Sequence, residues 1–295
     1  MGQCSFSKLI NDAESSPSIE ETRRSKPSNL LADRTIIVTG AATGIGQAFA
    51  LGCSAQGANV VVADINAADE TVAAIEHSGG NALAVRVDIA DSDSMQAMAA
   101  TALERFGRIN GLVNNAAYFR EVKLTPFEDL DSAQWDRIFA VNVKGVWQCC
   151  KAVMPAMRHQ GSGSIVNISS VVAVAGQPGY LHYVTTKGAV LSMTKGLAKE
   201  VGPYGVRVNV IAPGFVITNA TRNRPVEWQQ SFLKARAIAR ATAHRLGRHR
   251  ALLTVRFVRI HLWADDCGGR WTHHVLSDSP RFRPVPIRKT YEKKL

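Results

Sequence analysis

A tyrosine and a lysine in the second half of the chain, Tyr183 and Lys187, have a spacing that suits proton transfer. They lie four residues apart in a segment with helical periodicity, Tyr183–Val201, so both side chains point from one face of the predicted helix. A tyrosine with an ordinary pKa of about 10 is a poor base at neutral pH, and a lysine cation beside it favours the phenolate. The pair therefore predicts an acid/base group and the cation that lowers its pKa, although such pairs also occur in ordinary helices.

Two further polar residues complete a candidate catalytic set. Ser170 follows a predicted strand, Ser164–Ile168, and its hydroxyl suits a hydrogen bond to a carbonyl or alkoxide oxygen. Asn142 lies in a predicted long helix, Asp131–Arg158. Each residue alone has an ordinary structural interpretation, because serines often cap helices and asparagines often form buried hydrogen bonds. Their value as catalytic candidates depends on their occurring together with the tyrosine and the lysine.

Three glycines, Gly40, Gly44 and Gly46, stand where the predicted strand Thr35–Thr39 turns into a predicted helix, Ile45–Gln56. A Cβ atom in such a turn would block the approach of a pyrophosphate to the backbone. The start of the helix also supplies free N–H groups and a positive dipole end. Because the glycines lie between a strand and a helix, they predict a site for a dinucleotide.

A second predicted strand, Asn59–Ala63, runs directly into Asp64. This carboxylate comes about 20 residues after the glycines, where a dinucleotide-binding domain carries its ribose ligand. It would accept hydrogen bonds from both ribose hydroxyls and repel a 2′-phosphate, so it predicts NAD rather than NADP. The alternative is a solvated carboxylate at the end of a strand.

Predicted strands and helices alternate along most of the chain. Continuous apolar strands that alternate with helices are typical of a parallel sheet that is covered on both faces. We therefore expect a single α/β domain, a doubly wound parallel sheet of the Rossmann type with helices on both faces. The other predicted strands are Ala82–Val87, Gly111–Asn114 and Val206–Ile211, and the other predicted helices are Asp69–His77 and Ser92–Phe106.

Composition and charge exclude several classes of protein. No segment has the roughly 18 uninterrupted apolar residues of a membrane span, and the polar N-terminal 30 residues lack the apolar core of a secretory signal. The five cysteines show no metal-ligand spacing, so we expect free thiols, no metal and a cytoplasmic location. Residues 221–295 carry 17 Lys+Arg against 5 Asp+Glu, whereas residues 1–220 carry 18 against 19, so the basicity belongs to the C-terminal part.

Taken together, these motifs resemble the short-chain dehydrogenase/reductase family. The resemblance covers about residues 31–218 and also includes an Asn-Asn-Ala segment after the fourth strand, where Ala117 replaces the family's usual glycine. Its motifs are the glycine turn TGxxxGIG, Asn114-Asn115-Ala116, VNVKG around Asn142, ISS ending at Ser170, Tyr183 with Lys187, and Pro213-Gly214.

The resemblance implies a role for each candidate residue. Tyr183 would be the general acid/base, and Ser170 would stabilise the substrate oxygen. Lys187 would lower the pKa of Tyr183 and contact the nicotinamide ribose. Asn142 would hold a water that continues the proton path to solvent. The implied cofactor contacts are Gly40, Thr43, Gly44, Ile45, Gly46, Asp64, Asp88 and Ile89 (adenine side), Asn115 and Ala116 (ribose), Tyr183, Lys187, Pro213, Gly214, and Ile217 and Thr218 (carboxamide side).

We therefore expect an NAD-dependent oxidoreductase that interconverts a secondary alcohol and a ketone. The resemblance also implies a homodimer or homotetramer, an association that the aberrant C-terminal part would disfavour. One alternative is a reductase of 3-oxoacyl groups on a carrier protein, because the segment Leu181–Lys187 resembles such members. Asp64 argues against this alternative, since reductive biosynthesis usually uses NADP. Another alternative is a non-catalytic protein whose basic C-terminal part binds nucleic acid.

The C-terminal part departs from the family after about Ala243. We divide the chain into a polar, disordered extension (1–30), the catalytic domain (31–242) and an aberrant basic tail (243–295). Back-translated and read one base later, Trp263–Thr272 permits G-Q-T-I-V-V-D-G-G, which resembles the family's last strand, and His244–Leu253 permits T-D-L-V-G-T-A-L-F-L, the helix before it. This pattern indicates a shift of reading frame near Ala243–His244; the alternative is a genuine, divergent basic tail.

The nucleotide sequence tests the frame hypothesis, since its alternative phase should encode both family segments. If it does not encode them, the hypothesis is wrong. A shifted frame would remove the last parallel strand and leave Val206–Ile211 without a pairing partner on one side. We then expect an unstable, aggregation-prone product with low or no activity. Soluble protein with a cooperative thermal transition and good turnover would contradict this expectation.

Overall fold

The computed structural model describes residues 29–216, 218, 221, 261–266 and 270–275. Ile217, nearly all of the N-terminal extension and most of the basic tail lie outside these residues. No helix in the described part of the chain is long and apolar enough to cross a membrane.

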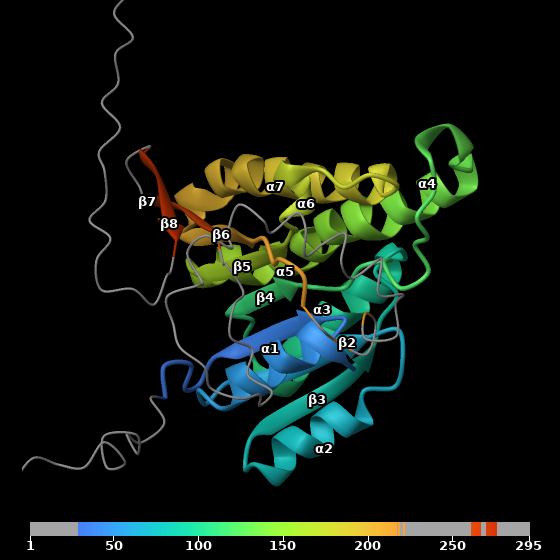
Figure 1. Ribbon diagram of the computed structural model, residues 1–295. Coiled ribbons are helices and arrows are strands. Elements are labelled where there is room, and N and C mark those ends of the chain that lie inside the picture. Colours follow the sequence, from blue (N-terminus) through green and yellow to red (C-terminus); the bar gives the residue numbers. More distant parts are fainter. Residues whose placement is uncertain (1–28, 217, 219–220, 222–260, 267–269, 276–295) are drawn as a thin grey trace, which may run out of the picture.

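The centre of the molecule is a sheet whose first six strands are parallel, in the order β3-β2-β1-β4-β5-β6 (Figure 1). The order reverses between β1 and β4, and in such sheets ligands bind at this switch point, beyond the carboxyl ends of the strands. The expected doubly wound fold is confirmed. The strands are β1 (Thr35–Thr39), β2 (Asn59–Asp64), β3 (Asn81–Arg86), β4 (Gly111–Asn114), β5 (Gly163–Ile168) and β6 (Val206–Ile211).

Helices cover both faces of this sheet because consecutive strand residues point in opposite directions. Ile37 and Val61 pack in the cluster that faces α3 and α5, whereas Val38 and Val60 pack in the cluster that faces α1 and α2. The α-helices are α1 (Gly44–Ser54), α2 (Asp69–His77), α3 (Ser92–Phe106), α4 (Ser132–Phe139), α5 (Val146–Gln160), α6 (Val172–Ala175) and α7 (Leu181–Val201). The 3₁₀-helices are η3 (Phe127–Asp129) and η5 (Gly202–Tyr204), and η4 (Ala140–Gly145) is a π-helix.

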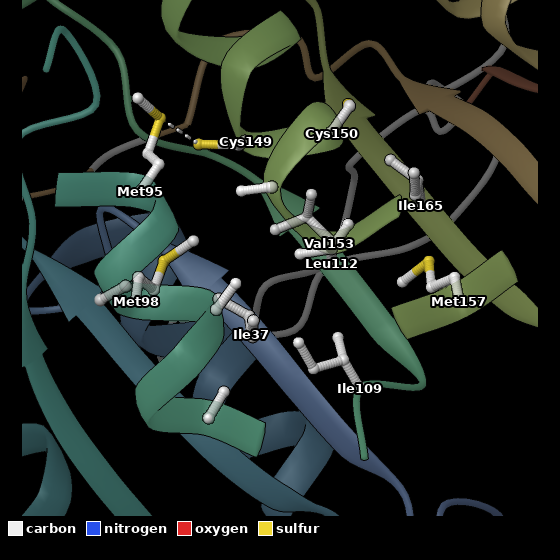
Figure 2. Close-up of a cluster of buried hydrophobic side chains, with 14 of the residues drawn as sticks. Ile37, Met95, Met98, Ile109, Leu112, Cys149, Cys150, Val153, Met157 and Ile165 are labelled. Carbon is white, nitrogen blue, oxygen red and sulfur yellow. Dashed lines mark hydrogen bonds between the residues drawn. The ribbon is translucent and has the colours of Figure 1, made fainter. Parts of the chain in front are cut away.

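The larger core cluster lies between the central strands and the helices α3 and α5 (Figure 2). Fully buried methionines of α3, Met95 and Met98, face Cys149 and Val153 of α5 across it. Burying one such side chain contributes about 1.5–3 kcal/mol. The cluster therefore packs against the adjacent strands β1 and β4, between which the strand order reverses.

The predicted long helix Asp131–Arg158 is divided in the structure. Asp131 caps α4 by accepting a hydrogen bond from Gln134 N at 3.3 Å, and α5 continues to Gln160. Between them, η4 is a π-helical turn that contains Asn142. Such turns are rare and are frequent at functional sites, because the wider turn re-aims a side chain.

The sheet differs from the prediction at its far edge. Two further strands, β7 (His261–Asp266) and β8 (Arg270–Val275), form an antiparallel pair, and β7 pairs with β6 at Val210↔Trp263. The expectation that β6 lacks a partner on this side is therefore wrong. The physical reason is that the N–H and C=O groups of an open strand edge accept another extended segment with little regard to its side chains.

Candidate active site

The glycine turn between β1 and α1 has two crowded positions and one open one. A Cβ atom on Gly40, whose φ is +64°, would lie 2.7 Å from Cα of Ala116, and one on Gly46 would collide with the carbonyl oxygen of Gly40. A Cβ on Gly44 would meet nothing nearer than the Thr218 side chain at 3.8 Å. Gly40 and Gly46 therefore let the turn pack tightly, and the missing side chain of Gly44 leaves the outer side of the turn free for a ligand.

The start of α1 is free to bind an anion. Thr43 is the N-cap residue, but its side chain forms no capping hydrogen bond, and no acidic residue lies in the first turn. The first N–H groups of the helix, at Gly44 and Ile45, therefore have no side-chain partner from this cap. Together with the open side of the turn, they fit the diphosphate of a dinucleotide.

Asp64, at the end of β2, is buried, and its carboxylate is hydrogen-bonded to the glycine turn. Its Oδ2 accepts a hydrogen bond from Ala42 N at 2.9 Å, and its Oδ1 accepts two bonds from Asn66, from N at 2.9 Å and from Nδ2 at 3.1 Å. A carboxylate has about four acceptor positions, so these bonds leave about one for a ribose hydroxyl. The expected pair of ribose bonds is therefore reduced to one in this arrangement.

Thr39, which the sequence analysis did not select, ties the turn to the segment after β4. Its Oγ1 accepts hydrogen bonds from the N atoms of Asn115 and Ala116, both at 3.1 Å. The Asn115 Nδ2 donates to the carbonyls of Thr39 and Gly40, both at 3.0 Å. A threonine that ends a strand just before the glycines was the available signal. Ala117 has no positive φ, so the backbone here does not require the family's glycine.

Asn142 is fully buried and joins three segments. Its Oδ1 accepts from Tyr118 N at 2.7 Å, while its Nδ2 donates to Tyr118 O at 3.2 Å and to Thr186 Oγ1 at 3.3 Å. The Thr186 hydroxyl in turn donates to the carbonyl of Tyr183 at 2.8 Å. These bonds use both N–H groups of Asn142 and leave one acceptor position on Oδ1. Asn142 therefore fixes α7 beside η4.

Lys187 lies buried beneath Tyr183. Its Nζ donates to the carbonyl oxygen of Ile168 at 2.8 Å and lies 5.7 Å from the centre of the Tyr183 ring. Burial lowers the pKa of Lys187 to about 8. An ammonium group has three N–H donors, so two remain for other partners.

Tyr183 has a pKa above its usual range. Burial raises that pKa most, the hydrogen bond with Ser170 lowers it, and the neighbouring Tyr180 raises it again. The ring packs against Phe119, with centroids 4.8 Å apart, and against Tyr180 at 6.4 Å. The expected lowering by Lys187 is not found: its amine donates to the carbonyl of Ile168 and lies 5.7 Å from the centre of the Tyr183 ring, and burial dominates the shift. At neutral pH the side chain therefore carries its proton.

Ser170 serves the local backbone as well as the site. Its Oγ accepts a long hydrogen bond, 3.4 Å, from Val172 N at the start of α6. Its hydrogen bond with Tyr183 places the two hydroxyl groups together. The capping and the functional interpretations of this serine are thus compatible.

The remaining implied cofactor residues lie in the loops that follow β3 and β6. Asp88 Oδ1 accepts from Ala90 N at 2.9 Å, and the neighbouring Ile89 is buried. The carbonyl of Pro213, beside Gly214, accepts from Val171 N at 3.1 Å. Thr218 N donates to Thr221 Oγ1 at 2.8 Å. These loops follow the carboxyl ends of parallel strands, where the fold gathers a site.

The fold and these residues define a dinucleotide-binding α/β fold in which a tyrosine and a lysine lie side by side beyond the end of β5. A family model described as short chain dehydrogenase matches residues 34–228, and the chain belongs to that family. It is accordingly an oxidoreductase of a family that uses a nicotinamide cofactor.

Individual relatives agree with this assignment. The chain is 41% identical over 200 residues to a 3-oxoacyl-[acyl-carrier-protein] reductase of Synechocystis sp., covering 67% of this chain and 80% of the relative. It is 46% identical over 184 residues to the short-chain reductase protein NovJ of Streptomyces niveus, covering 62% and 69%. Among solved structures, NAD⁺-bound xylitol dehydrogenase matches with a TM-score of 0.62 at 30% identity, covering 68% of this chain and 75% of the other.

Replacing Gly46 by alanine tests the tight packing of the turn. The added Cβ would collide with the Gly40 carbonyl, so we expect Gly46→Ala to lower the free energy of unfolding by about 1–3 kcal/mol and to weaken NAD binding. Gly52 is the matched control, because it lies in the same helix with nothing within 4 Å of an added Cβ. Gly52→Ala should stabilise the protein by about 0.5–1 kcal/mol. Equal stabilities of the two variants in chemical denaturation would contradict the packing account.

Proposed function

We propose that the protein is an NAD-dependent oxidoreductase that interconverts a secondary alcohol and a ketone. The observation that carries this proposal is the arrangement of Tyr183, hydrogen-bonded to Ser170 and lying over the buried amine of Lys187. Proton transfer and stabilisation of a substrate oxygen are the tasks that these groups suit.

The proton chemistry follows from the residues. A nicotinamide dinucleotide supplies the hydride acceptor for alcohol oxidation and the hydride donor for ketone reduction. The hydroxyl of Ser170 holds the substrate oxygen, and Tyr183 takes the hydroxyl proton in oxidation or returns it in reduction. Lys187 supplies positive charge that favours the phenolate, and we assign Asn142 the connection of this path to solvent.

The cofactor preference is proposed from Asp64. Its carboxylate stands behind the glycine turn and retains about one acceptor position, which suits a ribose hydroxyl. A phosphate in the same place would face a negative charge at short range, and an effective dielectric constant near 20 makes such repulsion worth several kcal/mol. We therefore propose that NAD binds in preference to NADP.

A second candidate function is the reduction of a 3-oxoacyl group on a carrier protein. It is favoured by the 41% identity to the Synechocystis reductase, a relative of that name. Its chemistry needs the same proton donor and the same oxygen ligand, so the catalytic residues do not separate the two. Asp64 argues against it through the cofactor.

The organisation of the chain is also part of the proposal. We propose that residues 31–242 form the catalytic domain of a cytoplasmic enzyme, which acts on a small-molecule substrate and can associate with further copies of itself. The segment 243–295 would then be an aberrant tail. An inactive, frame-shifted product is the alternative state of this chain, and the nucleotide sequence distinguishes it.

The pH dependence of the two directions tests the role of Tyr183. Because its pKa lies above the usual range, the phenol persists to higher pH. Ketone reduction needs the protonated phenol, so the ionisation of Tyr183 should not change kcat/KM for this direction near neutral pH. For alcohol oxidation, which needs the phenolate, kcat/KM should rise as pH increases. Tyr183→Phe should lower both by about 10²–10⁴-fold. Retention of more than about a tenth of the activity would contradict the assignment.

The ratio of NADPH to NADH affinity tests the role of Asp64. Asp64→Asn removes the charge but keeps an amide oxygen for the turn, so the ratio should rise about tenfold or more. Asp88→Asn is the matched control, since Asp88 also follows a strand and binds a nearby N–H group through its carboxylate. It should leave the ratio nearly unchanged. An unchanged ratio in Asp64→Asn would show that another residue sets the cofactor.

A further inference from the structure

Ser169, the residue before Ser170, connects the end of β5 to two other elements. Its Oγ donates to the main-chain carbonyl oxygen of Lys187 at 2.8 Å. Its N–H donates to the carbonyl of Ile211, at the end of β6, also at 2.8 Å. The residue is only 2% exposed. A buried hydroxyl with this partner acts on the catalytic helix and cannot reach a substrate directly.

Lys187 is consequently held at both of its ends by consecutive residues that end and follow β5. The Ser169 hydroxyl binds its carbonyl, and the Ile168 carbonyl binds its amine at 2.8 Å. Adjacent residues of an α-helix differ by 1.5 Å in height and about 100° in direction. A shift of α7 by one residue would therefore break both bonds together.

The two hydrogen bonds at Lys187 matter because the face of α7 that packs on the sheet is largely polar. Its buried residues include His182, Thr186, Lys187 and Thr194, so much of this face is polar. Apolar contacts are non-directional, whereas a hydrogen bond requires a particular position of both partners. The register of α7 against the sheet therefore depends on a few directional bonds. A third one, from Asn167 Nδ2 to Thr194 Oγ1 at 2.9 Å, lies two turns further along α7.

We propose that Ser169 is a positioning residue that fixes Lys187 for its contact with the nicotinamide half of the cofactor. The inference rests on the proposed function and on the contact between Lys187 and the nicotinamide ribose that the family resemblance implies. The adenosine and diphosphate half is held elsewhere, by the turn after β1 and by Asp64 at the end of β2. Loss of the Ser169 hydroxyl should therefore affect the two halves of the cofactor unequally.

Dissociation constants for NADH and for ADP, measured on the full-length chain, test this separation without requiring turnover. ADP lacks the nicotinamide ribose, so it reports on the adenosine and diphosphate half of the site, which includes the glycine turn and Asp64. We expect Ser169→Ala to weaken NADH binding about tenfold and to leave ADP binding within about twofold. The ratio of the two constants is the readout, because a general loss of stability weakens both ligands.

Thr194→Val is the matched control. It removes another buried hydrogen bond between β5 and α7, the one that Asn167 donates, by a substitution of nearly equal shape two turns further along α7. We expect this variant to bind NADH and ADP as the unmodified chain does, even where both variants lower the melting temperature by similar amounts.

Each other outcome overturns the inference in a recognisable way. If Ser169→Ala and Thr194→Val behave alike, or if Ser169→Ala weakens both ligands equally, Ser169 has only a structural role. If NADH binding is unchanged in Ser169→Ala, the hydroxyl does not position Lys187. If the unmodified chain binds neither ligand, the proposed function itself is wrong, and the inference about Ser169 is wrong with it.

Discussion

The candidate site depends on the burial of one ammonium group against the sheet. Lys187 is 3% exposed, and its amine donates to the carbonyl of Ile168. Lysine is almost never fully buried without a partner, so this bond sets where α7 can sit. Tyr183, one turn earlier on α7, is thereby placed beside Ser170, just past the end of β5. The parallel sheet brings the glycine turn to the same edge.

The chemistry of Tyr183 is set by two opposing effects. Burial beside Phe119 and Tyr180 favours the neutral phenol, while the hydrogen bond from Ser170 favours the phenolate. Burial is the larger effect, so the side chain keeps its proton and is suited to donate it to a carbonyl. Lys187 has two N–H donors not used by Ile168, and in the proposed function its positive charge favours the phenolate that alcohol oxidation needs.

The strands could be predicted from the sequence, and the candidate catalytic residues could be selected from it, because their signals are local. Apolar runs identify β1 to β6, and glycine spacing identifies the turn. The raised pKa of Tyr183 could not be predicted, since its largest cause is burial, and the side chain packs against Phe119, which is distant in the sequence. The same holds for the bonds that occupy Asp64 and for the partner of β6, which depend on where other segments pack.

Thermal unfolding of the purified full-length chain, with and without NAD, tests the central claim most directly. The account predicts a single cooperative transition whose midpoint rises with NAD concentration, because a ligand that binds only the folded state stabilises it. A chain without a cooperative transition, or one whose midpoint does not respond to NAD, would contradict the claim that these residues form a working dinucleotide site.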